Sequence, residues 1–112
     1  MNTPENLRED VAWKAAIWLQ IEMGLHCKIH LHLSTSNELR CWGAAWPHDS
    51  EPNTYCVSVA EDQSLRDFIA TIAHEMTHVR QWVQDKYVGD GEEEANLMQY
   101  ELADEMWKGG VI

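Results

Sequence analysis

The chain has 112 residues, with 19 acidic and 8 basic side chains and a formal net charge of −11 at pH 7. This length suits one hydrophobic core, and an apolar fraction of 45% predicts a single packed domain over residues 1–112. The acidic excess argues against nucleic acid and anionic membranes as partners, because both are bound through clustered Lys and Arg. The three cysteines lack CxxC spacing and do not indicate a disulfide framework.

The N-terminal segment is polar and acidic, unlike a signal peptide, and no apolar run approaches the roughly 18 residues that span a bilayer. We therefore expect a cytoplasmic protein. The first predicted element is a helix that starts with Thr3 as cap and Pro4 at the first helical position, and ends at Gly24. Apolar residues recur along it at spacings of three and four, as one buried face requires: Leu7, Val11, Ala15, Trp18, Ile21 and Leu25.

Three short strands are predicted next, over residues 27–34, 39–46 and 55–59, because apolar and polar residues alternate there. His30 and His32 share the polar face of the first strand, where they form either a second metal site or, more simply, part of a solvated sheet face. The cysteines are interpreted as small buried apolar groups.

Ser64 and Asp67 resemble a capping box and predict the start of a second long helix. The Gly89–Gly91 segment interrupts the chain, and a third helix is predicted from Glu92 to Trp107. The second helix has the apolar stripe Leu65, Phe68 or Ile69, Ile72, Met76, Val79 and Val83, and the third buries Ala95, Met98, Leu102 and Met106. Helix, three strands, helix and helix together predict an α+β fold.

His74-Glu75-Met76-Thr77-His78 is an HExxH motif inside the second helix. Residues four apart project from the same helical face, so the imidazoles of His74 and His78 can bind one Zn²⁺. Glu75 lies beside that face, where it can accept a proton from a water on the metal. The motif predicts a zinc site, whereas a pair of histidines on a solvated helix face is the simpler alternative.

A catalytic zinc needs a third protein ligand. The extended motif HExxHxxGxxH is absent, because Gln81 and Gln84 occupy the positions of its Gly and its last His. The remaining source of a ligand is the acid-rich helix downstream, which carries Glu92-x-Glu94-Ala95-Asn96.

These segments resemble the gluzincin metallopeptidases, and in particular the small ImmA/IrrE-type proteases and minimal gluzincins, some of which phages encode. The likeness covers about residues 55–107. It implies a zincin-like fold with a Zn²⁺ cofactor, in which the C-terminal helix supplies Glu92 as the third ligand. It also implies that Asn96 orients a ligand histidine.

Two alternatives remain for the acidic residues. Glutamates in a first helical turn stabilise the helix dipole, and Asp90 with Glu93 resembles a capping box. If the metal helix ran unbroken to Tyr87, its end would lie about 13 Å beyond His78, and Glu101 would reach the metal better than Glu92. Glu92 as a ligand therefore requires the metal helix to end soon after Gln81.

The function that we expect is a zinc metallopeptidase with His74, His78 and Glu92 as ligands and Glu75 as general base, acting on a peptide or protein. The alternative is a zinc-binding, protease-like module without catalysis that binds proteins or regulates them. The strand Tyr55–Val59 is the candidate edge for holding an extended peptide. Trp42 and Trp46 either line a substrate cleft or fill the core, and Tyr87 and Tyr100 are the phenols available to stabilise an oxyanion. The oligomeric state is left open.

Overall fold

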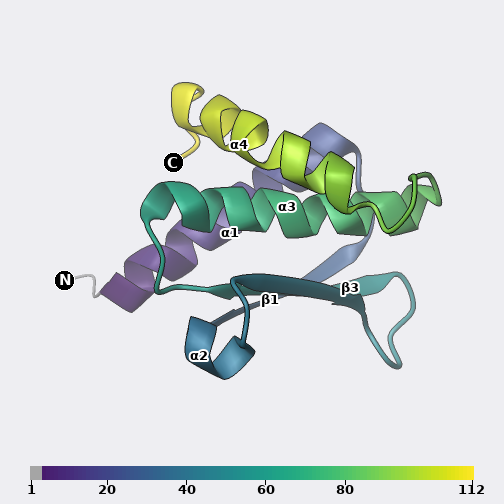
Figure 1. The fold of residues 1–112 in the computed structure, drawn as a ribbon, viewed down its shortest axis with the longest axis horizontal. Coiled ribbons are helices and arrows are strands. Elements are labelled where there is room, and N and C mark those ends of the chain that lie inside the picture. Colours follow the sequence, from purple (N-terminus) through teal and green to yellow (C-terminus); the bar gives the residue numbers. More distant parts are fainter. Residues whose placement is uncertain (1–3) are drawn as a thin grey trace.

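The computed structural model describes residues 4–112, with side chains from Leu7 onward (Figure 1). The expected Thr3 cap lies outside the described residues. The elements in chain order are α1 (Pro4–Met23), β1 (Lys28–Ser34), α2 (Ser36–Leu39), β2 (Gly43–Pro47), β3 (Thr54–Ala60), α3 (Leu65–Gln84) and α4 (Glu92–Lys108). The α+β class is confirmed. Among the described residues, no helix combines the length and the apolarity needed to cross a membrane.

The three strands form one mixed sheet in the order β1-β3-β2. β3 pairs with β1 in parallel, with Ile29 opposite Tyr55, and with β2 antiparallel, with Gly43 opposite Val59. β3 is therefore the central strand, and the expectation that Tyr55–Val59 forms a free edge is wrong. The edge strands are β1 and β2, and of these two it is β2 that contacts α3.

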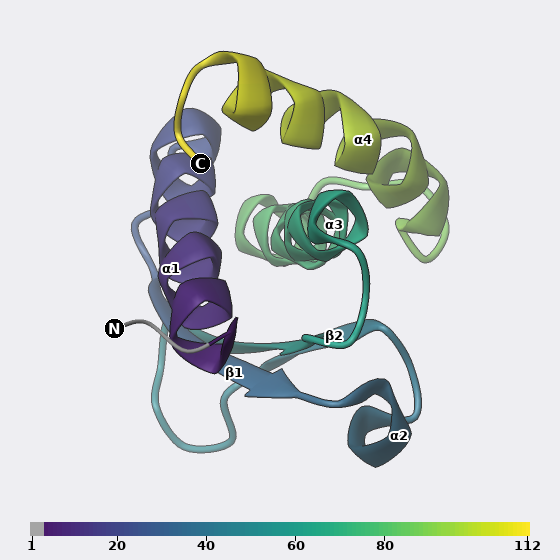
Figure 2. The ribbon, with the colours of Figure 1, turned by 90° about the vertical axis from the view of Figure 1, so that its left-hand side faces the viewer.

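Helix α3 occupies the middle of the molecule. Figure 2 looks along it and shows the sheet on one side, α4 on the opposite side and α1 along a third. The buried apolar side chains of these elements form one core around α3: Val11, Ala12, Ala15, Leu19, Leu25, Ile29, Val57, Val59, Phe68, Ile69, Ala70, Ile72, Ala73, Met76, Val79, Leu102, Ala103 and Met106. The HExxH segment therefore lies on a helix that is fixed by packing from three directions.

The buried face of α1 differs from the predicted one. Leu7 is 54% exposed and Ile21 is 76% exposed, whereas Ala12 and Ala16 are fully buried. The small alanines allow α1 to lie close to its neighbours, and burying them rotates the larger residues outward. At the other end of the core, Val83 in the last turn of α3 is also exposed.

The predicted second strand starts too early, because residues 36–39 form the short helix α2. Thr35 and Glu38 cap it reciprocally, since the Thr35 side chain accepts from the Glu38 N–H and the Glu38 carboxylate accepts from the Thr35 N–H. Arg40 then adopts a left-handed conformation, and β2 starts at Gly43. Cys41, in this connection, is exposed, and Cys27 is only half-buried, so the expectation of three buried cysteines holds for Cys56 alone.

The two ends of α3 and the start of α4 are well defined. Ser64 caps α3 as predicted, with its hydroxyl oxygen 3.2 Å from the Asp67 N–H nitrogen. The helix ends at Gln84, and Asp85 adopts a left-handed conformation that reverses the chain. The N-cap residue of α4 is Gly91, so Asp90 and Glu93 do not form the capping box that was the alternative role for these acidic residues.

Candidate metal centre and adjoining cleft

The structure brings His74, His78 and Glu92 together, with the candidate ligand atoms of all three within 4.8 Å of one another. The His78 Nε2 lies 2.5 Å from one Glu92 carboxylate oxygen, and the His74 Nε2 lies 3.3 Å from the other. Because α3 stops at Gln84, α4 returns alongside it and begins beside the two histidines. Of the two alternatives for the third ligand, the geometry therefore supports Glu92; Glu101 is exposed and lies outside this cluster.

Gln81, which is fully buried, determines which ring nitrogen of His78 bears hydrogen in the neutral imidazole. The Gln81 amide nitrogen donates to the Gly91 carbonyl (3.0 Å) and to the Glu94 carboxylate (2.8 Å), so its oxygen must be the atom that faces His78 Nδ1 at 2.9 Å. Nδ1 therefore carries the proton, and Nε2 offers a lone pair toward Glu92. The Nε2 lone pair and the Glu92 carboxylate oxygen are both donors that a metal ion can bind.

His74 and His78 are also held by groups that the sequence did not reveal. The Gln99 amide oxygen lies 2.8 Å from His74 Nδ1, and the Trp82 ring stacks on His78 with centroids 5.9 Å apart. Asn96, which the family resemblance assigned to orient a histidine, is exposed. The Nδ1 atoms face glutamines instead, which act in the same way as the carboxylates that usually support metal-binding histidines.

Glu75 lies between the histidines and the β2 edge, and only 7% of it is exposed. Burial raises the pKa of its carboxyl group, while His74 and His78 oppose that shift and Glu92 adds to it. A Cβ atom placed on Gly43 would lie 3.0 Å from a Glu75 carboxylate oxygen, so β2 approaches this side chain very closely. The carboxylate is therefore confined next to the candidate ligands.

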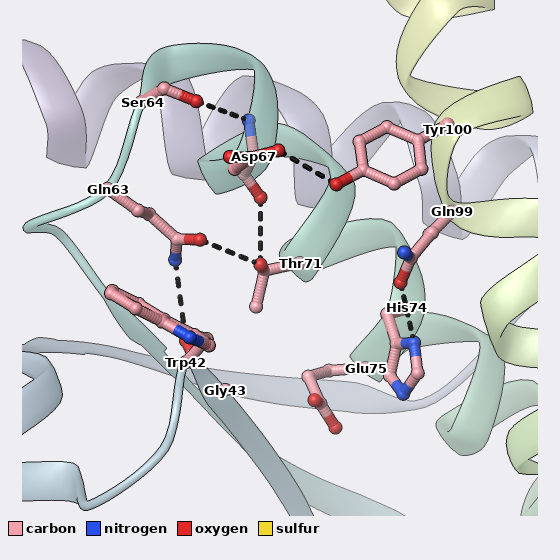
Figure 3. A pocket seen from close by; sticks show the side chains of 10 residues that line it. All are labelled: Trp42, Gly43, Gln63, Ser64, Asp67, Thr71, His74, Glu75, Gln99 and Tyr100. Carbon is pink, nitrogen blue, oxygen red and sulfur yellow. Dashed lines mark hydrogen bonds between the residues drawn. The ribbon is translucent and has the colours of Figure 1, made fainter.

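A cleft of about 580 Å³ opens beside His74 and Glu75 and continues along α3 toward its N-terminus (Figure 3). Its walls come from four places in the chain, namely the residues at the start of β2, the connection between β3 and α3, one face of α3 and the middle of α4. The lining residues are Trp42, Gly43, Gln63, Ser64, Asp67, Thr71, His74, Glu75, Gln99 and Tyr100. A ligand in this cleft would therefore reach Glu75.

The cleft distinguishes between the aromatic residues for which the sequence left two roles open. Trp42 lines it and is 54% exposed, so Trp42 is a cleft residue and not a core residue. Trp46 is exposed and pairs with Cys56 across the sheet, away from the cleft lining. Tyr100 lines the cleft and donates its hydroxyl proton to Asp67 (2.8 Å), whereas Tyr87 lies in a different groove with Val88 and Leu97.

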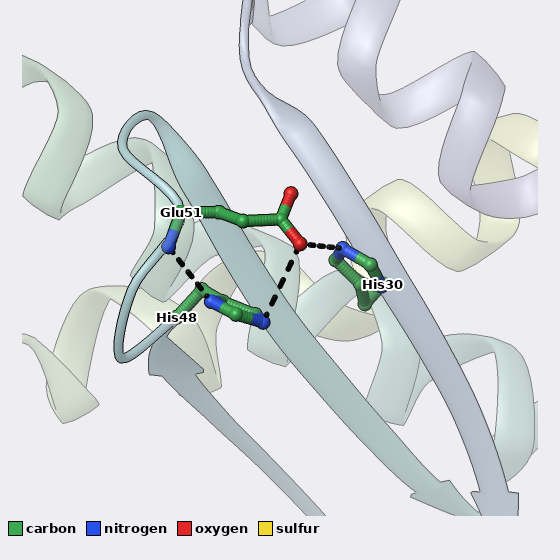
Figure 4. A group of neighbouring side chains, drawn as sticks. All are labelled: His30, His48 and Glu51. Carbon is green, nitrogen blue, oxygen red and sulfur yellow. Dashed lines mark hydrogen bonds and ion pairs between the residues drawn. The ribbon is translucent and has the colours of Figure 1, made fainter.

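A second group of possible metal ligands, His30, His48 and Glu51, lies across the sheet near the end of β2 (Figure 4). His32, the expected partner of His30, is exposed and outside this group. The His48 Nδ1 accepts backbone N–H groups of Ser50 (3.2 Å) and Glu51 (3.0 Å), so this nitrogen is unprotonated. In the neutral ring the proton is then on Nε2, which points at Glu51 and has no lone pair for a metal. This group is therefore a poorer metal site than His74, His78 and Glu92.

Comparisons of the chain with protein-family models, with curated proteins and with solved structures give no match. The geometry of the chain's own residues is therefore the basis of the function proposed below.

Proposed function

We propose that the chain is a zinc-dependent metallopeptidase of gluzincin type with a zincin-like fold, in which Glu75 is the general base. The convergence of His74, His78 and Glu92 beside Glu75 carries the proposal. Two imidazoles and one carboxylate are a donor set that suits zinc and leaves a coordination position free. When bound, zinc lowers the pKa of a water molecule toward about 7 and polarises a carbonyl oxygen.

Glu75 would move the proton in this reaction. Its carboxylate accepts a proton from the attacking water and passes it to the leaving amine after the peptide carbonyl has been attacked. The raised pKa of Glu75 suits this role, because a carboxylate with a higher pKa is a stronger base toward the attacking water.

The β2 edge offers backbone groups to an extended substrate. The Ala60 N–H donates to the Trp42 carbonyl and the His48 N–H donates to the Thr54 carbonyl, which places the polar groups of Trp42 and His48 toward β3. By antiparallel alternation, Gly43 and Ala45 direct theirs toward the free edge. A peptide paired there would pass directly in front of Glu75.

The test combines metal content with hydrolysis of an unstructured protein. Zinc-loaded wild type is expected to cleave it, and Glu75→Gln is expected to keep zinc but lose at least about 100-fold in rate, the scale of general base catalysis. The matched control is Glu101→Gln, an exposed glutamate outside the cluster, which should behave as wild type. Equal rates for wild type and Glu75→Gln would contradict the general-base role.

One observation favours the alternative of a zinc-binding module without catalysis. The free edge of β2 is short, since it ends at Pro47 and the Gly43 carbonyl already accepts from the Cys41 thiol (3.2 Å). A module of this kind would bind zinc with the same three residues and bind a protein partner without cleaving it. Stoichiometric zinc with no hydrolysis of any unstructured protein would select this alternative.

A further inference from the structure

The cleft beside Glu75 carries a negative charge at its far end. Asp67 lies in the first turn of α3, two helical turns before His74, and lines the cleft together with Trp42 and Tyr100. Its carboxylate accepts the Tyr100 hydroxyl, and this hydrogen bond, together with the one from Ser64, lowers the pKa of Asp67. The group is therefore ionised at neutral pH and held in one orientation.

Arg66 contributes to the lowered pKa of Asp67, but its direct contacts are with other groups. The Arg66 guanidinium lies over the Tyr100 ring at 4.6 Å and pairs with Asp104 at 3.7 Å. Arg66 is not among the residues that line the cleft, whereas Asp67 and Glu75 are. With the net charge of −11, the cleft should attract a cation and repel an anion.

The Trp42 side chain supplies an aromatic surface in the same cleft. More than half of it is exposed, although tryptophan is usually well buried. An exposed indole face attracts Lys and Arg side chains and also packs against their aliphatic stems. Trp42 and Asp67 thus provide the two contacts that a long basic side chain makes best.

The distance along α3 limits where such a side chain would come from. Two helical turns separate Asp67 from His74 by about 10 Å. An extended peptide advances about 3.3 Å per residue, so this span corresponds to about three residues.

We propose that the cleft is a subsite for a basic side chain, Lys or Arg, of an extended peptide, with Asp67 as the ion-pair partner and Trp42 as the aromatic wall. The basic residue lies within about three residues of the peptide bond that faces Glu75. The inference rests on the proposed function for the nature of the ligand, an extended peptide.

The experiment compares two blocked ten-residue peptides that differ only in a central lysine or acetyl-lysine, which removes the charge. Binding to zinc-loaded Glu75→Gln protein is measured by calorimetry, so that the peptide is not cleaved. Acetylation is expected to weaken binding at least about fivefold, the scale of one exposed ion pair with a cation–π contact. Adding Asp67→Asn should reduce this discrimination below about twofold. Adding Glu105→Gln, which removes an exposed charge from α4 outside the cleft, should preserve it.

Equal binding of the two peptides, no binding of either, or full discrimination in the Asp67→Asn protein would each overturn the subsite. Hydrolysis by the zinc-loaded wild type tests the proposed function separately, with cleaved bonds mapped by mass spectrometry. Cleavage without a lysine or arginine within three residues of the bond leaves the peptidase standing and removes the subsite. Lysine discrimination without any cleavage supports the subsite and removes the peptidase.

Discussion

Gln81 joins the metal helix to the start of α4 through contacts with His78, the Gly91 carbonyl and the Glu94 carboxylate. Glu94 in turn pairs with Arg80 at 2.7 Å, so the network connects the candidate ligand to a charged pair at the surface. A Cβ atom on Gly91 would overlap the Gln81 amide, and Gly91 has a φ of 79°. Glycine is therefore required at this position for two reasons, the close approach and the left-handed backbone.

The first prediction concerns Gln81. Gln81→Leu is expected to lower zinc affinity about 10- to 100-fold, because His78 loses the acceptor that fixes its Nδ1 proton and its ring orientation. Zinc titration against a competing chelator measures the change. Gln84→Leu, on the exposed last residue of α3, is the matched control and should keep wild-type affinity. Unchanged affinity in Gln81→Leu would show that the glutamine serves only to pack α3 against α4.

The second prediction concerns the third ligand. Glu92→Gln is expected to weaken zinc binding more than about tenfold, roughly 1.4 kcal/mol, because an amide oxygen is a weaker zinc donor than a carboxylate. Its neighbour Glu93 is exposed and lines a different groove, with Lys86, so Glu93→Gln should leave zinc affinity unchanged. Glu101→Gln completes the titration series. Loss of zinc only in the Glu101 variant would contradict the arrangement seen here.

Part of the candidate site could be predicted from the sequence alone. The HExxH spacing alone places His74, Glu75 and His78, because a helix puts residues four apart on one face. Gln81 and Gln99 were missed, since a glutamine near a metal-binding histidine has no characteristic spacing. The signal for Gln81 was its position three residues after His78, because residues three apart on a helix lie on the same face.

At the level of elements, the approach of β2 to α3 is the contact that shapes the site. A Cβ atom on Gly43 would lie 2.5 Å from the Thr71 methyl group and 3.2 Å from the Glu75 Cγ. Real Cβ contacts are longer, so any side chain at this position forces β2 away from the helix or displaces Glu75.

The third prediction follows from this contact. Gly43→Ala is expected to destabilise the protein by about 1–3 kcal/mol, the usual cost of overpacking, and to reduce hydrolysis by moving Glu75. Thr71→Ser removes the methyl group that the new side chain meets first. The double variant should therefore recover part of the stability, as measured by urea unfolding. Additive losses in the double variant would place the strain elsewhere.

The strand pairing could not be predicted from the sequence. Alternation locates strands but carries no information about partners, because pairing is set by contacts between distant residues. β3 illustrates the limit: Ser58 alternates with Val57 and Val59 as on the polar face of an edge strand, yet it is buried, and β3 is the central strand. The helix ends were more predictable, since Ser64 and the Gly89–Gly91 break act locally.

On the scale of the whole molecule, the candidate centre connects the two long helices near the chain reversal. Glu92, Glu93 and Glu94 all lie in the first turn of α4. Glu92 approaches the buried face of α3 where Glu75 already lies, so the two carboxylates repel each other. The net charge of −11 adds to this repulsion. A divalent cation between His78 and Glu92 would replace that repulsion with attraction and fasten the start of α4 to α3.

The last prediction is that zinc stabilises the fold. A free ion concentration one hundred times the Kd adds about 2.7 kcal/mol to the free energy of unfolding. For a domain of this size, that raises Tm by on the order of 10 °C. Thermal unfolding followed by circular dichroism, with zinc or with a chelator, measures this shift. Magnesium is the control ion, because it prefers oxygen ligands and should not bind two imidazoles. The shift should shrink in Glu92→Gln, since the connection between α3 and α4 then loses its carboxylate. If zinc raises Tm no more than magnesium does, the three residues do not form a zinc site.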